Sequence, residues 1–303
     1  MTTPTSMNTT AGTTTARTST TAGTSTTAGA RHAEPTRGYR STGLRLLRSE
    51  LIRFTTVRSN VITVAALGLL MVLIGVIAAA TSTGAVTGVG PGGAPAPGFA
   101  GTGPLATVLA GSTPGVLVVG VLGVLVGARE YGSGMIRTTM TADPRRIGAF
   151  LARIGAFIAV VLPATVLASL VAYGAGTAML SAGGAPTAAW GDPGVARAVI
   201  GTGVYLAGVG LLGLCLGVLT RSIGQGVGWL VGLVMVLPGF GALLLPDDLQ
   251  HVAQYFPSNA GAAFTTITES SSQLGAGPGA AVFLAWVVGL GTVAAVMLRR
   301  RDV

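Results

Sequence analysis

The chain has 303 residues, of which 50 % are apolar and 9 % are charged, and its formal net charge is +9. A soluble domain of this length does not keep such a composition in solution, so the composition indicates an integral membrane protein. The basic residues flank apolar runs and do not interleave with aromatic residues on a soluble face, which argues against nucleic acid as a partner.

Residues 1–38 form a tract of Thr, Ser, Ala and Gly. Its apolar content is too low to offset the conformational entropy lost on ordering, so we expect a disordered tail. The tract has no apolar core of the kind found in secretory signal peptides, and the first apolar run is therefore expected to act as an uncleaved anchor. Residues 39–303 are expected to form a single membrane domain.

The segment from Ser41 to Arg58 has the pattern of an amphipathic helix. Its apolar stripe has helical spacing and consists of Leu44, Leu47, Leu51 and Phe54. Four arginines accompany the stripe: Arg45, Arg48, Arg53 and Arg58. The pattern predicts an interface helix along the membrane surface, with arginine stems reaching the headgroups. Whether this helix also contacts a protein partner stays open.

Six apolar runs follow, at about 61–80, 105–128, 147–180, 195–220, 223–246 and 279–298. Each is long enough to cross the bilayer, which takes roughly 20 residues. The sequence thus predicts an all-α, polytopic membrane protein with six transmembrane helices. The third run contains Pro163, which predicts a tilt or kink there.

The arginines predict how the chain is oriented. With six spans, the basic residues that flank the runs lie on one side, except Arg197. The positive-inside rule therefore places both termini and the loop from Ala128 to Arg153 in the cytosol, in a multi-pass protein of the cytoplasmic membrane. In the last outer loop, Leu249, Val252 and Phe256 predict a short helix before Pro257, serving as an interfacial anchor or as a gate.

The runs lack the residues that drive transport or catalysis. No Asp, Glu or His lies well inside a run, which argues against a proton- or sodium-coupled carrier. The chain contains no lysine, so a lysine-dependent phosphate loop is excluded. Cys215 is the single cysteine, which excludes a disulfide framework or a cysteine metal cluster. We therefore expect no catalytic, cofactor or metal site, and any energy for transport has to come from another protein.

Glycines recur at four-residue spacing in the fourth and fifth runs, at Gly213 and Gly217 and then at Gly224, Gly228 and Gly232. Such spacing lets helix backbones approach closely in lipid. The glycine faces pack either within the subunit or against a second copy, and the sequence leaves both possibilities open.

The loop from Ala128 to Arg153 carries most of the polar chemistry between two spans. Gly132 and Gly134 are expected to interrupt the second span, residues 135–141 to form a short helix, and Asp143-Pro144 to begin the third span. A short helix held between two spans can transmit movement from a cytosolic partner. The alternative is a charged hairpin that only fixes topology.

A resemblance favours the first alternative. The residues Glu130, Tyr131, Gly134, Arg137, Pro144, Arg145 and Arg146 resemble E-Y-x-x-G-T-x-R followed by P-x-R, a pattern in the first intracellular loop of type-2 permease subunits of ATP-binding-cassette transporters. The likeness extends to the arginine-rich helix, the six spans, Tyr255-Phe256-Pro257 and the terminal Arg300-Arg301-Asp302.

The resemblance implies an exporter in which these seven loop residues couple the permease to a separate ATPase subunit. That subunit would hold ATP and Mg²⁺, and two permease copies would pair in a homodimer. Two other functions remain open, namely a secondary carrier and a non-transporting membrane anchor or sensor subunit.

Overall fold

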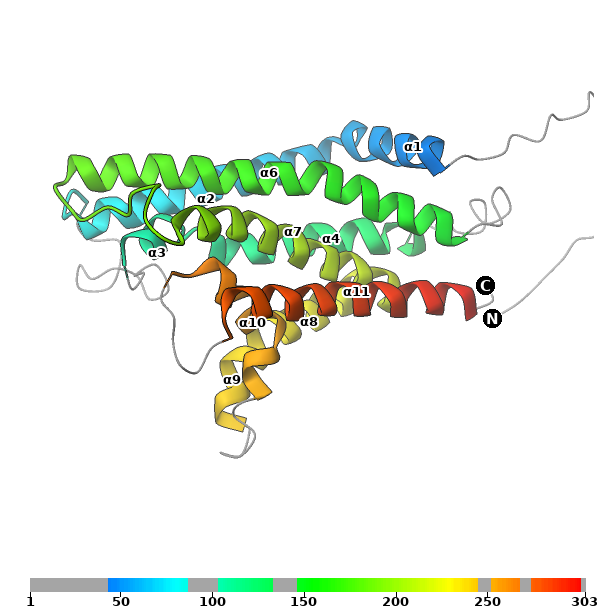
Figure 1. Ribbon diagram of the computed structural model, residues 1–303. Helices are drawn as coiled ribbons and strands as arrows, with labels where there is room; N and C mark the ends of the chain where they lie inside the picture. Colours follow the sequence, from blue (N-terminus) through cyan, green and yellow to red (C-terminus); the bar gives the residue numbers. More distant parts are fainter. Residues whose placement is uncertain (1–42, 87–102, 133–145, 245–251, 268–273, 301–303) are drawn as a thin grey trace, which may run out of the picture. The chain divides into compact units, whose positions relative to one another are not determined.

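The computed structural model describes residues 43–86, 103–132, 146–244, 252–267 and 274–300. The expected tail of residues 1–38 lies outside them, as does the loop segment 133–145. Within the described part, the regular structure is helical and contains no strand. The helices are α1 (Gly43–Thr56), α2 (Arg58–Ser82), α3 (Pro104–Val108), α4 (Ser112–Gly132), α6 (Arg146–Ala182), α7 (Val195–Thr220), α8 (Ile223–Val231), the π-helix η2 (Gly232–Val236), α9 (Leu237–Leu244), α10 (Pro257–Thr265) and α11 (Ala276–Arg300) (Figure 1).

Six of these segments are long and apolar enough to span a membrane, which confirms the predicted all-α, six-span class. They are Arg58–Ser82, Ser112–Arg129, Ile147–Ala182, Val195–Thr220, Ile223–Phe240 and Ala276–Arg300. The fourth and sixth begin and end within about three residues of the predicted runs, because polar or glycine-rich segments bound those runs on both sides.

The second predicted run, 105–128, is wrong at its start. The chain forms α3, turns over Leu109–Gly111 and begins α4 only at Ser112. The turn lies so close to α2 that a Cβ on Gly111 would be 2.6 Å from the Cα of Met71. Contact between helices, which hydropathy does not encode, therefore ends α3 inside an apolar run.

α7 lies at the centre of the helices, and it is the most buried of the six candidate spans. Its closest neighbour is α4. A Cβ on Gly213 would overlap the carbonyl oxygen of Gly120, and a Cβ on Gly217 would lie 2.5 Å from the carbonyl oxygen of Val124. The glycines of α7 therefore pack within the subunit, which settles that part of the question left open by the spacing.

The glycines of the fifth span behave differently. A Cβ on Gly224, Gly228 or Gly232 would meet no atom of the described residues within 4 Å. The same span exposes Trp229 of α8 and Phe240 of α9, which are 67 % and 52 % accessible. This face of α8 and α9 is therefore not used for packing within the described part of the chain.

α6 is the longest helix, with 37 residues, and it continues through Pro163. At 1.5 Å per residue its length is about 55 Å, well beyond the roughly 30 Å of the hydrocarbon core. Two residues after the proline, the hydroxyl of buried Thr165 lies 2.8 Å from the carbonyl oxygen of Gly203 on α7. A buried polar contact thus joins α6 and α7 close to the proline.

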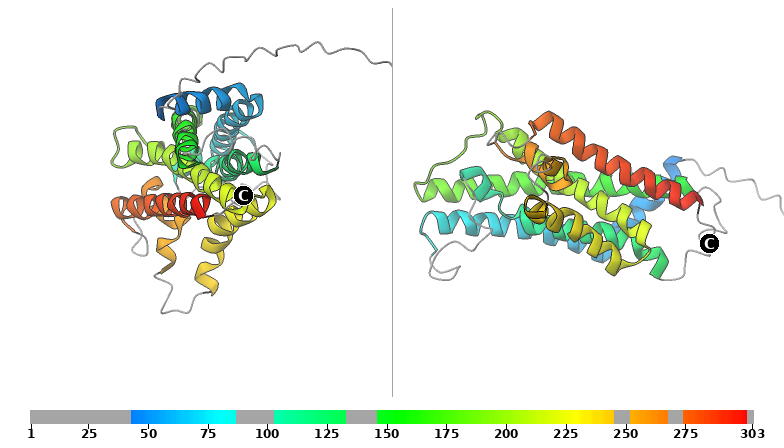
Figure 2. Two further views of the ribbon diagram at one scale, coloured as in Figure 1. Left: turned by 90° about the vertical axis from the view of Figure 1, so that its right-hand side faces the viewer. Right: turned by 90° about the horizontal axis from the view of Figure 1, so that it is seen from below.

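The fifth span is interrupted by η2, and the carbonyl of Val234 in this π-helix accepts a hydrogen bond from Ser258. Ser258 belongs to α10, which lies beside the fifth span in both views of Figure 2. A π-helix leaves its carbonyls misaligned with the regular helical pattern, and a side-chain donor can satisfy one of them.

The predicted short helix before Pro257 lies partly outside the described residues, which do not include Leu249. Residues 252–255 form a short 3₁₀ helix before the proline, and a separate helix, α10, starts at Pro257 and continues after it. Proline fits the first helical position because its missing N–H needs no partner there, and the preceding Phe256 is extended, as the ring requires. Phe264 of α10 then packs on both Tyr205 of α7 and Phe283 of α11, at ring-centroid distances of 6.4 and 5.9 Å.

Candidate functional site

The described arginines gather at one end of the helices, which we call the arginine-rich end. It comprises α1, the start of α2, the end of α4, the start of α6, the α7–α8 turn and the end of α11. Its described arginines are Arg45, Arg48, Arg53, Arg58, Arg129, Arg146, Arg153, Arg221, Arg299 and Arg300. Arg197, in the first turn of α7, lies at the opposite end.

α1 docks on α6 at this end. Phe54 is only 6 % exposed, and its ring meets that of Phe157 edge to face at a centroid distance of 6.0 Å. Leu47 lies against Gly155 of α6, and a Cβ on Gly155 would be 3.0 Å from the leucine side chain. Leu44, by contrast, is 76 % exposed. The apolar stripe predicted to face the membrane surface therefore faces two environments. Leu47 and Phe54 pack on α6, whereas Leu44 stays exposed.

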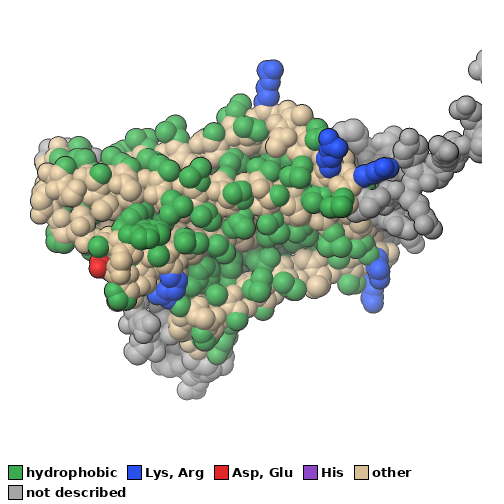
Figure 3. Space-filling view, turned by 45° about the horizontal axis from the view of Figure 1, so that its top comes forward, with side chains coloured by type: hydrophobic (Ala, Val, Ile, Leu, Met, Phe, Trp, Pro, Cys, Tyr) green, Lys and Arg blue, Asp and Glu red, His purple; other side chains and the backbone are tan. Residues whose placement is uncertain are grey.

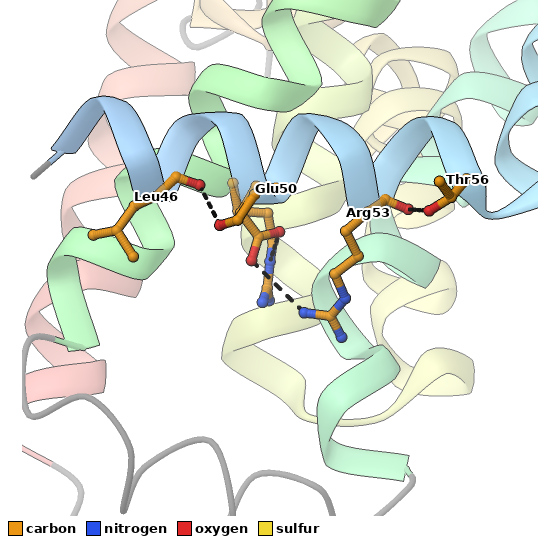
Figure 4. A network of polar contacts seen from close by, with 6 residues as sticks. Leu46, Glu50, Arg53 and Thr56 are labelled. Atoms are coloured by element: carbon orange, nitrogen blue, oxygen red, sulfur yellow. Dashed lines mark hydrogen bonds and ion pairs between the residues drawn. The ribbon is translucent and has the colours of Figure 1, made fainter. Parts of the chain in front are cut away.

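Glu50 of α1 lies between two arginines. Its carboxylate oxygens are 3.7 Å from Nη1 of Arg53 and 3.7 Å from Nε of Arg153 on α6. Figure 4 shows Glu50 and Arg53 directed toward each other below α1. The Glu50 and Arg153 side chains are 18 % and 11 % exposed, so this contact is screened less than one at the surface. The pair ties α1 to α6 through charge as well as through the aromatic contact.

A second polar contact ties α4 to α2. Nη2 of Arg129 donates to the side-chain oxygen of buried Asn60, at 3.3 Å, and lies 3.5 Å from the hydroxyl oxygen of Ser59. Asn60 in turn donates to the carbonyl of Phe54, the last buried residue of α1. Between the two contacts is a small cavity of about 30 Å³, enough for one water molecule, lined by Glu50, Arg53, Arg129 and Arg153 among others.

The loop residues of the predicted coupling site fall at the boundaries of the described part. Glu130 and Tyr131 lie in the last turn of α4, and Arg146 begins α6. Gly134, Arg137, Pro144 and Arg145 lie outside the described residues. The structure therefore brings the two ends of the loop to the arginine-rich end and leaves the contacts of the loop itself as a prediction.

The four predicted interface arginines are all exposed, as expected for headgroup contacts; they are Arg45, Arg48, Arg53 and Arg58. Arg53 also forms an ion pair with Glu50, which in turn contacts Arg153. Sequence reasoning did not single out Glu50 or Asn60. A usable signal existed for Glu50, since it is the one acidic residue between residues 41 and 129 and lies in an arginine-rich helix.

These contacts fix α1, α2, α4 and α6 relative to one another at the arginine-rich end. In the described residues, no three His, Cys, Asp or Glu side chains come together as a metal site. Comparison with models of known protein families and with curated proteins finds no match for this chain. Its interpretation therefore depends on the geometry and on the loop pattern.

Proposed function

We propose that this chain is the permease subunit of an ATP-driven exporter in the cytoplasmic membrane, with both termini in the cytosol and a separate ATP-binding-cassette ATPase as its partner. One observation carries the proposal. The helices that flank the loop, α4 and α6, are each anchored at the arginine-rich end, by Arg129 to Asn60 and by Arg153 to Glu50. A push on the loop would therefore reach α1 and α2 as well as α4 and α6.

The partner would supply the energy. ATP and Mg²⁺ are assigned to the ATPase subunit, because this chain has no lysine for a phosphate loop. In this proposal the permease itself is not an enzyme. Closure of the ATPase pair would move the segment from Glu130 to Arg146, which includes Tyr131, Gly134, Arg137, Pro144 and Arg145, and the long α6 would carry that movement across the membrane.

A second permease copy completes the proposed assembly. The open glycine face of α8, with exposed Trp229 on the same helix, supports pairing of this kind because small residues permit close helix approach in lipid. Lipid is the alternative neighbour of this face. The oligomeric state of the full chain in nanodiscs distinguishes the two.

The coupling role is tested with Glu130→Ala and Arg137→Ala. Truncating one member of a charged contact to a partner costs about 2–5 kcal/mol, and we expect ATPase retention or ATP-dependent efflux to fall at least tenfold, about 1.4 kcal/mol. Expression and melting in detergent should stay near those of the unmodified chain. Arg299→Ala is the matched control, because Arg300 preserves the basic end of α11.

Three results would contradict this proposal. Gradient-driven flux in vesicles that contain the permease alone would indicate a secondary carrier. Unchanged ATPase binding and efflux in both loop variants would show that the loop is a charged hairpin that only fixes topology. A protein that binds the ATPase but moves no substrate would be a membrane anchor or sensor.

A further inference from the structure

An apolar groove lies away from the arginine-rich end and away from the proposed coupling loop. It is bounded by α6, α7, α10 and α11 and encloses about 680 Å³, within the range of about 300–1,000 Å³ typical of small-molecule sites. Figure 3 shows the hydrophobic side chains that gather over this face of the helices. Every residue that lines the groove is apolar or glycine, except Arg197.

The floor of the groove is one face of α7. Gly201, Val204, Gly208 and Leu211 recur along it at three- and four-residue spacing. The two glycines let Phe264 and Phe283, which also line the groove, pack directly on α7. Phe283 and Leu284 of α11 form one wall. Leu211 is 14 residues beyond Arg197, a distance of about 21 Å along the helix, whereas one leaflet contributes about 15 Å of hydrocarbon. The groove is thus long enough for one extended acyl chain.

Arg197 supplies the polar end. Its Nη2 donates one hydrogen bond, of 3.2 Å, to the carbonyl of Thr266, and Thr266 is its one hydrogen-bond acceptor among the described residues. A guanidinium carries five donors, so donors remain for an oxyanion. Asp192 does not serve as that anion in the described structure, where no ion pair joins it to Arg197 and its Oδ2 accepts from the backbone N–H of Ala189.

The position of Arg197 is costly without an anion. It lies in the first turn of α7, where the helix dipole disfavours positive charge. It is also the described arginine that departs from the arginine-rich end, so the orientation of the chain gives no reason for it. A guanidinium at the mouth of a groove without other charged residues complements a molecule with one anionic head and an apolar tail.

We propose that the groove binds an anionic phospholipid, with one acyl chain along α7 and the phosphate on Arg197. The lipid belongs to the leaflet at the end opposite the arginine-rich end. This site does not depend on the exporter function, since it needs only the membrane-spanning fold. The bound lipid would fill the space between α6 and α11 and would hold these helices in their present spacing.

The test uses the full chain in nanodiscs with a phosphatidylglycerol that carries a photoreactive diazirine on one acyl chain. We expect the crosslinked peptides to be enriched for residues 200–211 and 277–287. Arg197→Gln should lower that crosslinking at least fivefold, and Arg197→Lys should largely restore it. Excess unlabelled phosphatidylglycerol should compete better than phosphatidylcholine, and inorganic phosphate should not compete.

A second pair of variants tests the groove without changing charge. Gly277 lines the groove and Gly289 does not, yet a Cβ on either meets no described atom within 4 Å, and both belong to α11. Gly277→Leu should therefore fill the groove and reduce crosslinking, whereas Gly289→Leu should not. Crosslinks spread evenly over lipid-facing helices would overturn the proposal, as would equal competition by phosphatidylcholine. If inorganic phosphate competed and unlabelled phosphatidylglycerol did not, the site would bind a free anion and not a lipid.

Discussion

At the scale of single residues, Glu50 connects more of the arginine-rich end than any other described acidic side chain. It neutralises part of the charge of Arg53 on its own helix and of Arg153 on α6. Removing one member of a partly buried ion pair leaves the other charge without its partner and still poorly solvated. The positive charges that remain would then repel one another across the junction between α1 and α6.

We predict that Glu50→Gln lowers the free energy of unfolding by about 1–3 kcal/mol, since hydrogen bonds and contacts to charged groups contribute on that scale. The glutamine keeps the size of the side chain, so the loss reports charge and not volume. Thermal melting of the purified chain in detergent measures it. Arg48→Gln is the matched control on the exposed face of the same helix, and its effect should stay within about 0.5 kcal/mol. Equal melting of the two variants would show that the ion pair contributes nothing.

The sequence predicted that the basic residues gather at this end, but not which side chains they pair with. Periodicity assigned Leu47 and Phe54 to one face of α1, and the structure keeps them together. Periodicity does not say whether that face meets lipid or another helix, because both neighbours are apolar. The role of Asn60 could not be predicted from the sequence, because it depends on contacts with Phe54 of α1 and Arg129 of α4.

At the scale of elements, the contact between α4 and α7 depends on the absence of side chains. Gly123 of α4 and Gly213 of α7 allow the two backbones to approach so closely that an added methyl on either would meet a carbonyl oxygen of the other helix. In lipid this closeness replaces the hydrophobic driving force of a soluble core, because packing is what remains to favour association. The helix pair should therefore tolerate alanine poorly.

We predict that Gly213→Ala destabilises the protein by about 1–3 kcal/mol, the usual cost of overpacking. Gly228→Ala is the matched control, since its methyl meets no described atom. A denaturant titration in detergent measures the free energy of unfolding of both variants, which carry the same glycine-to-alanine change. If Gly228→Ala destabilises the protein as strongly, the contact between α4 and α7 is not what limits stability.

Element boundaries were predictable only where the sequence itself ends the apolar run. α7 and α11 are bounded in this way. The break between α3 and α4 was not, because it depends on how closely Gly111 approaches α2. The start of α10 could have been predicted, since a proline after an aromatic residue suits the first position of a helix as well as the end of one.

At the scale of the whole molecule, the described ends of the spans separate charge sharply. Ten described arginines lie at one end, and Arg197 lies at the other. The positive-inside rule predicts that the arginine-rich end faces the cytosol. Single cysteines test this orientation, because the one native cysteine, Cys215, is buried and can be replaced by alanine.

In a Cys215→Ala background, Ser82→Cys and Ser181→Cys place thiols at exposed positions at the ends of α2 and α6, and Ser49→Cys places one on the exposed surface of α1. We predict that an impermeant maleimide labels the first two in intact cells, and labels Ser49→Cys only after the membrane is permeabilised. The physical reason is that α2 and α6 each cross the bilayer once from the arginine-rich end, so both of their far ends must emerge on the same side. Labelling of Ser49→Cys in intact cells would show the opposite orientation and would contradict the proposed cytosolic coupling loop. Labelling of only one of the two other sites would break the six-span arrangement itself, because α2 and α6 could not then run in the same direction.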